Sequence, residues 1–596
     1  MSLRAAAPTD QPSPKNRLAG RFMLSLRALL RSSELALVAA ASVVGLVAAL
    51  CVTAMTQCAI ALHVLIFNLP FDVRLSAVDR VSPWAAFGAL SLGGLSLGLM
   101  ELWRLKHKIP VPVDPIEANA LRGGRMSLRD SFVVGTQTLI SNSVGASVGL
   151  EAGYAQVGSS LGSFLGQKLR LRRSDLRLLV AAGAAGAIGG SFGAPLTGAF
   201  YAFEIILGAY SIAGAGPIFA ASIVGVLTTH FILGAPYQIS TPLSQPLTLA
   251  DYPLLFGLAA CSAAFGIFAM RAAGLSEKAL QATHLPVWAR PVLGGLLMAA
   301  LAIVTPQVLG AGRGALALNI ATAFSLSALA AVLVLKMMAC LISLAAGFRG
   351  GLFFASLLMG ALLGKIYAVI VAALLPVLVP DPTICILVGM ATMGVVIVGG
   401  PLTMSFLVLE NTADFSVTAG VLAASIAASL IARSTFGYSF STWRLHLRGE
   451  NIRSANDIGW IDDLTVGRLM QPDPRKIDAE ASLANLCALY SLGSAREIVV
   501  TDSDGRYKGL VNLAEAHVHA QNGGGKAQDL ARLADVSLTP GMNAKTAMAL
   551  FDRSQSDQLA VVDPLTAAPI GMLTEAYVAR RYAEKADAAA RGALGM

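Results

Sequence analysis

Two twelve-residue stretches decide how this chain folds: Gly193-Ala-Pro-Leu-Thr-Gly-Ala-Phe-Tyr-Ala-Phe-Glu204 and Gly399-Gly-Pro-Leu-Thr-Met-Ser-Phe-Leu-Val-Leu-Glu410. They lie 206 residues apart, and each joins a Pro-Leu-Thr break to an apolar run that ends in glutamate. Paired interrupted segments in the two halves of a membrane domain indicate a duplicated, often inverted fold with a site between the halves. The sequence therefore predicts an inverted repeat of broken helices.

Composition places most of the chain in a membrane. Of 596 residues, 55% are hydrophobic and 13% are charged, with a mean hydropathy of +0.67, whereas soluble domains carry about 25% charged residues. The acidic residues number 8 in 1–130, 8 in 131–440 and 19 in 441–596. We therefore expect a long membrane domain followed by a soluble domain, and we exclude a soluble multidomain enzyme.

The net charge of +9 needs no nucleic-acid partner, because basic residues gather at the ends of apolar spans, as at Arg170, Arg172 and Arg173. Such residues mark cytoplasmic ends. Residues 1–33 are polar and basic, without the apolar run of a signal peptide. We expect a multi-pass protein of the cell membrane with both termini, including the 1–33 segment, in the cytoplasm.

Interrupted apolar segments point to a transport site. Residues 35–66 and 84–102 are apolar and long enough to cross a bilayer, but from 131 to 440 many segments are broken by Gly, Pro and Ser. Such breaks are tolerated only where protein or an aqueous cavity satisfies the freed backbone groups. The sequence predicts an all-α polytopic membrane domain over residues 34–448.

Residues 465–585 have the composition of a soluble α/β domain and contain a second repeat. The apolar runs Glu497–Val500 and Leu559–Val562 are each followed by a polar turn, a second short apolar run and a helical pattern. We expect two similar α/β halves. The Ala-rich tail, residues 586–596, is expected to be disordered.

Glu151 is the most informative single residue, because it lies in a Gly- and Ser-rich membrane segment with no neighbouring basic residue. A charge within a membrane span costs at least about 2.5 to 3.5 kcal/mol and usually marks an ion or proton path. At a helix start, Glu151 would compete with a permeant anion for free amides and would leave when protonated. The alternative is an acid on a solvent-exposed loop.

The segments Gly149-Leu-Glu-Ala-Gly153 and Gly351-Leu-Phe-Phe-Ala355 resemble two motifs of the CLC family of chloride channels and proton-coupled chloride exchangers. The resemblance implies that Glu151 gates the path, in a homodimer with one pore per subunit. It also implies which backbone amides face the anion, namely those of Leu150, Glu151 and Ala152 at an outer site and those of Leu352 and Phe353 at a central site.

Two further anion-binding residues follow from the same resemblance. Pro112, in Val111-Pro-Val-Asp-Pro115, stands where the family has a serine hydroxyl; a proline there accompanies nitrate preference in plant exchangers, which leaves nitrate open beside chloride. The alternative is that Pro112 only shapes a turn. Tyr438 best matches the family's anion-coordinating tyrosine, although a tyrosine at a membrane boundary is often an interface anchor.

A channel is favoured over an exchanger by one departure from the family pattern. Exchangers carry an inner proton-transferring glutamate, and the local alignment puts Ile205 at that position. Glu204 and Glu410 match structural acids. The alternative, a proton-coupled exchanger that uses a different internal path, stays open.

Residues 465–585 resemble a tandem pair of CBS domains, which implies a regulatory module. Adenine-nucleotide-binding modules of this type carry a hydroxyl residue and an acid, whose equivalents here are Asn512, Glu515 and Thr574. Each half is incomplete. A bound adenine nucleotide and a ligand-free module that stabilises a dimer therefore both stay open, and no other cofactor is expected.

Other classes of function lack their motifs. An intramembrane metalloprotease needs His-Glu-x-x-His, which none of the seven histidines provides, and the six scattered cysteines show no metal-ligand spacing. A cation channel would need acidic residues along the path, where few occur. We therefore expect neither an enzyme nor a metal site.

Overall fold

The computed structural model describes residues 33–234, 247–375, 381–447, 464–522, 524–582 and 584. The expected N-terminal segment, apart from Ser33, and the tail 586–596 lie outside these ranges. The chain divides into two compact units, Met1–Asn456 and Asp457–Met596.

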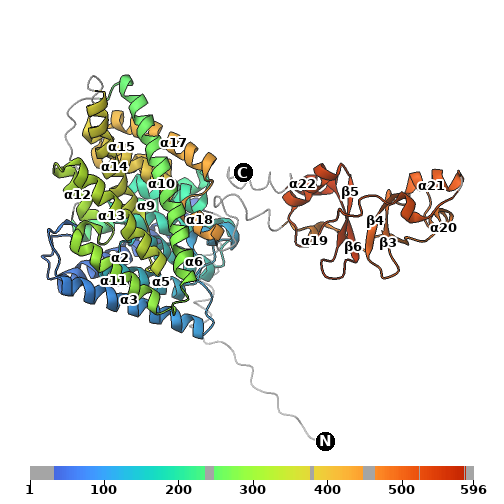
Figure 1. The fold of residues 1–596 in the computed structure, drawn as a ribbon, viewed down its shortest axis with the longest axis horizontal. Helices are drawn as coiled ribbons and strands as arrows, with labels where there is room; N and C mark the ends of the chain where they lie inside the picture. Colours follow the sequence, from blue (N-terminus) through green and yellow to red (C-terminus); the bar gives the residue numbers. More distant parts are fainter. Residues whose placement is uncertain are drawn as a thin grey trace, which may run out of the picture. The chain divides into compact units, whose positions relative to one another are not determined.

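The described part of the first unit is entirely helical (Figure 1) and contains the same series of helices twice. The first series is α2 (Glu34–Phe67), α3 (Pro83–Lys106), α4 (Pro115–Leu121), α5 (Leu128–Ser143), α6 (Glu151–Lys168), α7 (Arg173–Phe192), α8 (Pro195–Tyr201) and α9 (Ile212–Leu233). The second is α10 (Tyr252–Ala282), α11 (Ala289–Val304), α12 (Arg313–Ala321), α13 (Leu326–Ala346), α14 (Phe353–Leu374), α15 (Pro382–Val398), α16 (Pro401–Thr412) and α17 (Phe415–Thr435). Then α18 (Phe440–Leu447) ends the described part of this unit.

The two series share the packing of their helices as well as the order of their elements. In the first series α2 packs on α7 and α9, and in the second α10 packs on α15 and α17. Short single-turn pieces complete the unit: η1 (Leu75–Ala77), the π-helical η2 (Ala202–Leu207), η3 (Leu249–Asp251) and η4 (Pro306–Val308). The predicted duplication of broken helices is confirmed.

Seven helices of the described chain are long and apolar enough to cross a membrane, at Glu34–Phe67, Pro83–Lys106, Ile212–Leu233, Leu249–Ala282, Leu326–Ala346, Phe353–Leu374 and Phe415–His446. Between them lie shorter apolar helices, among them Pro195–Leu207 and Pro382–Val398. This mixture is the pattern expected where helices end inside a membrane domain.

The two stretches that begin with Gly193 and Gly399 hold the two series together. Each opens a helix with proline at its first turn, and the glutamate that ends one stretch accepts hydrogen bonds at the helix start of the other. Glu410 accepts from Leu196 N (2.6 Å), Thr197 N (2.9 Å) and Thr197 Oγ1 (2.7 Å). Glu204 accepts from Leu402 N (3.0 Å), Thr403 N (2.8 Å) and Thr403 Oγ1 (2.6 Å).

The second unit contains two three-stranded sheets flanked by helices (Figure 1). The strand orders are β2-β3-β4 and β1-β6-β5, from β1 (Gln471–Pro472), β2 (Lys476–Asp478), β3 (Glu497–Thr501), β4 (Tyr507–Asn512), β5 (Gln558–Val562) and β6 (Pro569–Thr574). The helices are α19 (Val466–Leu469), α20 (Leu483–Leu489), α21 (Leu513–Gln521), η5 (Ala527–Leu530) and α22 (Ala544–Ser554). The antiparallel hairpins β3–β4 and β5–β6 each carry a register shift near the end of their first strand, so the α/β repeat is confirmed.

We predict that Glu410→Ala lowers the free energy of unfolding of the membrane unit by about 3 kcal/mol, because two amides and a hydroxyl lose a charged acceptor. Glu204→Ala should cost at least as much, since Glu204 accepts three equivalent bonds and a fourth from Tyr210 Oη (2.9 Å). Glu410→Gln, which keeps one acceptor oxygen, should cost less. Denaturant unfolding in detergent measures these losses.

The matched control is Glu101→Ala, which removes a carboxylate from the ion pair with Arg104 at the end of α3. That pair is partly exposed, so the control should change stability by less than about 1 kcal/mol. Equal losses for Glu410→Ala and Glu101→Ala would contradict the bracing role.

Candidate functional site

Two glycines bring the starts of α6 and α14 together. Gly149 N donates to Gly351 O (2.8 Å), and Gly351 N donates to Gly149 O (3.0 Å), so an isolated antiparallel bridge lies just ahead of both helices. A Cβ on the adjacent Gly350 would lie 2.6 Å from Val148 Cβ and 2.8 Å from Gly149 O. The close approach therefore depends on glycine.

The starts of α6 and α14 have no side-chain caps. The residues before them, Leu150 and Leu352, make no capping hydrogen bond. Several other helices of the unit are capped by polar side chains, those of Ser127, Ser211, Ser325, Asp381 and Asp414, whereas α3, α7, α10 and α11 have no side-chain cap either. Because the first N–H groups of a helix have no intrahelical partner, both starts can receive an anion.

Most of the predicted anion-site residues line one cavity of about 150 Å³, which we name the inner cavity, namely Pro112, Glu151, Ala152, Leu352 and Phe353. Leu150 lines a second cavity of about 70 Å³, which we name the outer cavity, together with Glu151. Glu151 lines both cavities. Its side chain therefore lies where the two meet.

The Glu151 side chain is 3% exposed, which rules out the alternative of a solvent-exposed loop acid. Its carboxylate lies over Gly149, where an added Cβ would overlap Oε2. Oε1 is 3.6 Å from Arg313 Nη2, and Oε2 has no hydrogen-bond partner among the described residues. The carboxylate thus occupies the helix start that an anion would use.

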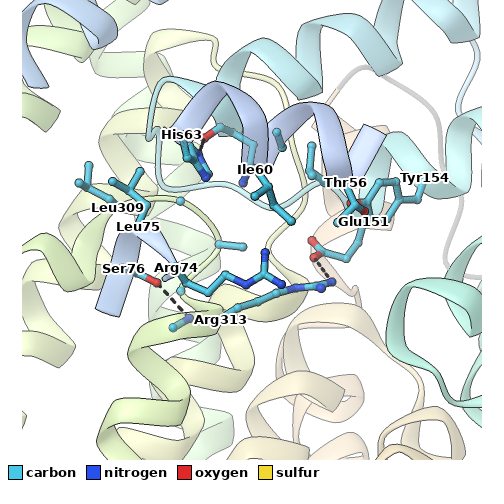
Figure 2. Close-up of a pocket in the computed structure, with 17 residues that line it drawn as sticks. Thr56, Ile60, His63, Arg74, Leu75, Ser76, Glu151, Tyr154, Leu309 and Arg313 are labelled. Atoms are coloured by element: carbon cyan, nitrogen blue, oxygen red, sulfur yellow. Dashed lines mark hydrogen bonds and ion pairs between the residues drawn. The ribbon is translucent and has the colours of Figure 1, made fainter. Parts of the chain in front are cut away.

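Sequence reasoning missed the basic residues of both cavities. Arg74 and Arg313 line the outer one (Figure 2), whereas Arg349 and Arg444 line the inner one. Arg313 lies more than 150 residues from Glu151 in the chain, so nothing local connects them. Arg349 had a usable signal, because it directly precedes the glycine pair of the second motif.

An acidic residue of the inner cavity was also missed. Asp114 lines it and caps α4, where Oδ1 accepts from Ile116 N (2.9 Å). Tyr201 lines the same cavity. The cavity thus contains two carboxylates and a phenol.

Tyr438 is not brought to the inner cavity. Its hydroxyl lies 3.3 Å from His446 Nδ1, and its ring stacks on that imidazole at a centroid distance of 4.7 Å. Phe440, Ser441 and Arg444 of α18 line the cavity. The anion contact expected of Tyr438 stays a prediction.

Ile205 is buried in η2 and places a hydrocarbon side chain where the sequence alignment put the inner acid. Its neighbour Glu204 is occupied by the hydrogen bonds to Leu402 and Thr403.

The residues singled out for nucleotide binding in the second unit serve internal contacts. The Asn512 side chain accepts from Ala514 N and Glu515 N and donates to Glu497 Oε1. Glu515 pairs with Arg532, and Thr574 lies opposite Gln558 at the end of β6. Asn512 and Glu515 thus stabilise the first half itself. Burial raises the pKa of the Glu497 carboxyl, which accepts from Asn512.

Residues 94–433 match the family model described as voltage gated chloride channel. The chain belongs to this family, the CLC family. It is 31% identical over 371 residues to a chloride channel protein ClcB-like of Ralstonia nicotianae, covering 61% of this chain and 86% of that one. It is 26% identical over 400 residues to the voltage-gated ClC-type chloride channel ClcB of Citrobacter koseri, covering 66% and 95%.

Solved structures share the fold of this CLC chain. A slow cyanobacterial Cl-/H+ antiporter aligns with a TM-score of 0.59 and 20% identity, covering 69% of this chain and 97% of that one. A eukaryotic CLC transporter aligns with a TM-score of 0.59 and 17% identity, covering 93% and 98%. A CLC-type fluoride/proton antiporter reaches a TM-score of 0.55 at 18% identity, covering 67% and 95%.

Proposed function

We propose that this CLC protein conducts a small inorganic anion, chloride or nitrate, across the cell membrane, and that Glu151 is its gate. One observation carries the proposal. The uncapped starts of α6 and α14 meet, and the Glu151 carboxylate occupies the start of α6. The chloride-channel relatives support the choice of an anion.

Amides suit this task better than full charges do. A permeant ion must be bound well enough to leave water and weakly enough to be released. Helix starts supply partial positive charge, so an anion can exchange with the Glu151 carboxylate without being trapped. When Glu151 is protonated or displaced, the outer helix start becomes available.

We propose channel-like conduction, because Ile205 has no proton to transfer at the position where the sequence comparison expects the inner acid. The second candidate is proton-coupled exchange, which Asp114 favours, since it lines the same cavity as Glu151. Two of the solved structures that share the fold are those of a Cl-/H+ antiporter and a fluoride/proton antiporter.

The proposal also includes a homodimer and a regulatory CBS pair in the cytoplasm. Exposed apolar side chains on α9 and α17, among them Leu227, Phe231 and Leu430, offer a surface for a second copy. Light scattering in detergent tests this dimer.

The CBS assignment is supported by the hairpins β3–β4 and β5–β6 and by the extension of the eukaryotic CLC match over both units. The basic turn between α6 and α7 supports the orientation. Calorimetry with ATP tests an adenine-nucleotide ligand.

We predict that Glu151→Gln raises anion flux at neutral pH and flattens its pH dependence, because the amide imitates the protonated carboxyl and carries no charge to hold at the helix start. Chloride efflux from reconstituted liposomes, measured from pH 4 to 8, checks this. Wild-type flux should rise as the pH falls. An unchanged rate and pH profile would remove Glu151 from the gating role.

Asp114→Asn separates the two candidate mechanisms. Asparagine keeps the cap of α4 but cannot carry the proton, so in an exchanger anion flux should persist while proton movement driven by a chloride gradient is lost. Internal pH recorded in the same liposomes measures this. If the wild type moves no protons uphill, exchange is excluded; if Asp114→Asn still moves them, another route carries the proton.

Pro112→Ser tests the choice of anion. Pro112 lines the inner cavity, and a serine there adds a hydroxyl donor that favours the smaller, more strongly hydrated chloride. We expect the ratio of nitrate to chloride flux to fall several-fold. An unaltered ratio would leave Pro112 with only a turn-shaping role.

A further inference from the structure

We propose that Arg313 is the positioning residue of the gate: its guanidinium holds the Glu151 carboxylate at the start of α6 and so sets the pH at which anion flux begins. This inference rests on the proposed gating role of Glu151. It assigns a function to a residue on α12, far in sequence from the motifs of the anion path.

The contact between the two side chains is direct. Arg313 Nη2 lies 3.6 Å from Glu151 Oε1, and the two side chains are 32% and 3% exposed. Figure 2 shows the guanidinium of Arg313 extending to the carboxylate, with Arg74 beside it. Leu150, the residue before Glu151, contributes no charge. The cation that faces the gate therefore comes from another helix.

The guanidinium is fixed in its place by neighbours other than Glu151. It lies over the ring of Phe354 at 4.1 Å from the centroid and near the ring of Phe192 at 5.7 Å. Its Nη2 also donates to Ser191 Oγ (3.1 Å). A planar guanidinium suits such stacking better than a compact ammonium does. These contacts fix the position of the charge independently of Glu151.

The backbone that carries Arg313 is held as firmly. Ser76 Oγ accepts from Gly314 N and Ala315 N, both at 3.1 Å, and so caps the start of α12. The fully buried Lys336 donates from Nζ to Val308 O (3.1 Å) and Gly310 O (2.8 Å). A loop braced from two sides cannot easily carry Arg313 away from the gate.

Other charged and titratable groups line the two cavities at Glu151. The outer cavity is lined by His63, Arg74 and Tyr154, and the inner cavity by Asp114, Tyr201, Arg349 and Arg444. Among the described residues, Arg313 makes the ion pair with Glu151. Its removal is therefore the change that acts most directly on the carboxylate.

The expected effect follows from the sign of the charge. Arg313 stabilises the ionised carboxylate and so favours its place at the helix start. Without it, Glu151 takes up a proton at higher pH, and the pH midpoint of flux should rise by about one to two units, the usual influence of an opposite charge at this distance.

The experiment compares full-length variants in liposomes by the pH profile of chloride efflux. Arg313→Gln should move the midpoint upward by about one to two units, whereas Arg313→Lys, which keeps the charge but loses part of the stacking, should move it by clearly less. Arg104→Gln removes a cation from an ion pair at the end of α3 and should leave the midpoint unchanged. A Lys variant that shifts as far as the Gln variant would overturn the proposal.

A double variant separates this inference from the gating proposal. In a Glu151→Gln background, Arg313→Gln should have no further effect on the profile, because no carboxylate remains to be held. If Arg313→Gln instead lowers flux equally in both backgrounds, Arg313 only attracts anions and the positioning role is wrong. If Glu151→Gln itself changes nothing, the gating proposal fails first.

If Arg313→Gln does not fold, a second variant tests the same proposal. Phe354→Leu removes the ring on which the guanidinium lies and loosens Arg313 without deleting it. The midpoint should then rise by a smaller amount. A midpoint equal to that of the wild type in a well-folded Phe354→Leu protein would count against Arg313 as the positioning residue.

Discussion

The N–H groups at the first turn of a helix need a hydrogen-bond acceptor. At two pairs of matching helices in the two halves of the membrane unit, this need is met in different ways. At α8 and α16 the acceptors are fixed, because Glu410 and Glu204 each accept three hydrogen bonds from the helix start of the other half. At α6 and α14 no side-chain cap exists. The fixed pair braces the fold, and the uncapped pair leaves donors for an anion.

Glutamate appears in both solutions, but its surroundings decide its role. Glu410 accepts through both carboxylate oxygens, so departure would leave several donors without partners. Glu151 has one oxygen without a hydrogen-bond partner in the described structure and one oxygen 3.6 Å from a cation. The attraction that keeps the Glu151 carboxylate in place is electrostatic and weakens when the carboxylate is protonated. The first arrangement is suited to a brace and the second to a gate.

The sequence predicted what depends on local pattern. The repeat at Gly193 and Gly399 predicted the duplicated fold, and the two motifs located the helix starts at Glu151 and Phe353. It did not predict that Tyr438 packs against His446 while Phe440 lines the cavity, because that arrangement depends on tertiary packing. Arg313 could not be predicted, since only the packing of α12 against α14 and η1 brings it to Glu151.

The charge distribution follows from that packing. A basic residue beside Glu151 in sequence would move with the same helix start, whereas Arg313 is carried by α12 and braced by Ser76 and Lys336. The cation can therefore stay while the carboxylate leaves. In the proposed gating, an anion that replaced the carboxylate would meet the same guanidinium and the same amides, so the entry of one would be offset by the departure of the other. Because both states neutralise the same positive groups, the two can lie close in free energy, which is the condition for a gate that responds to pH.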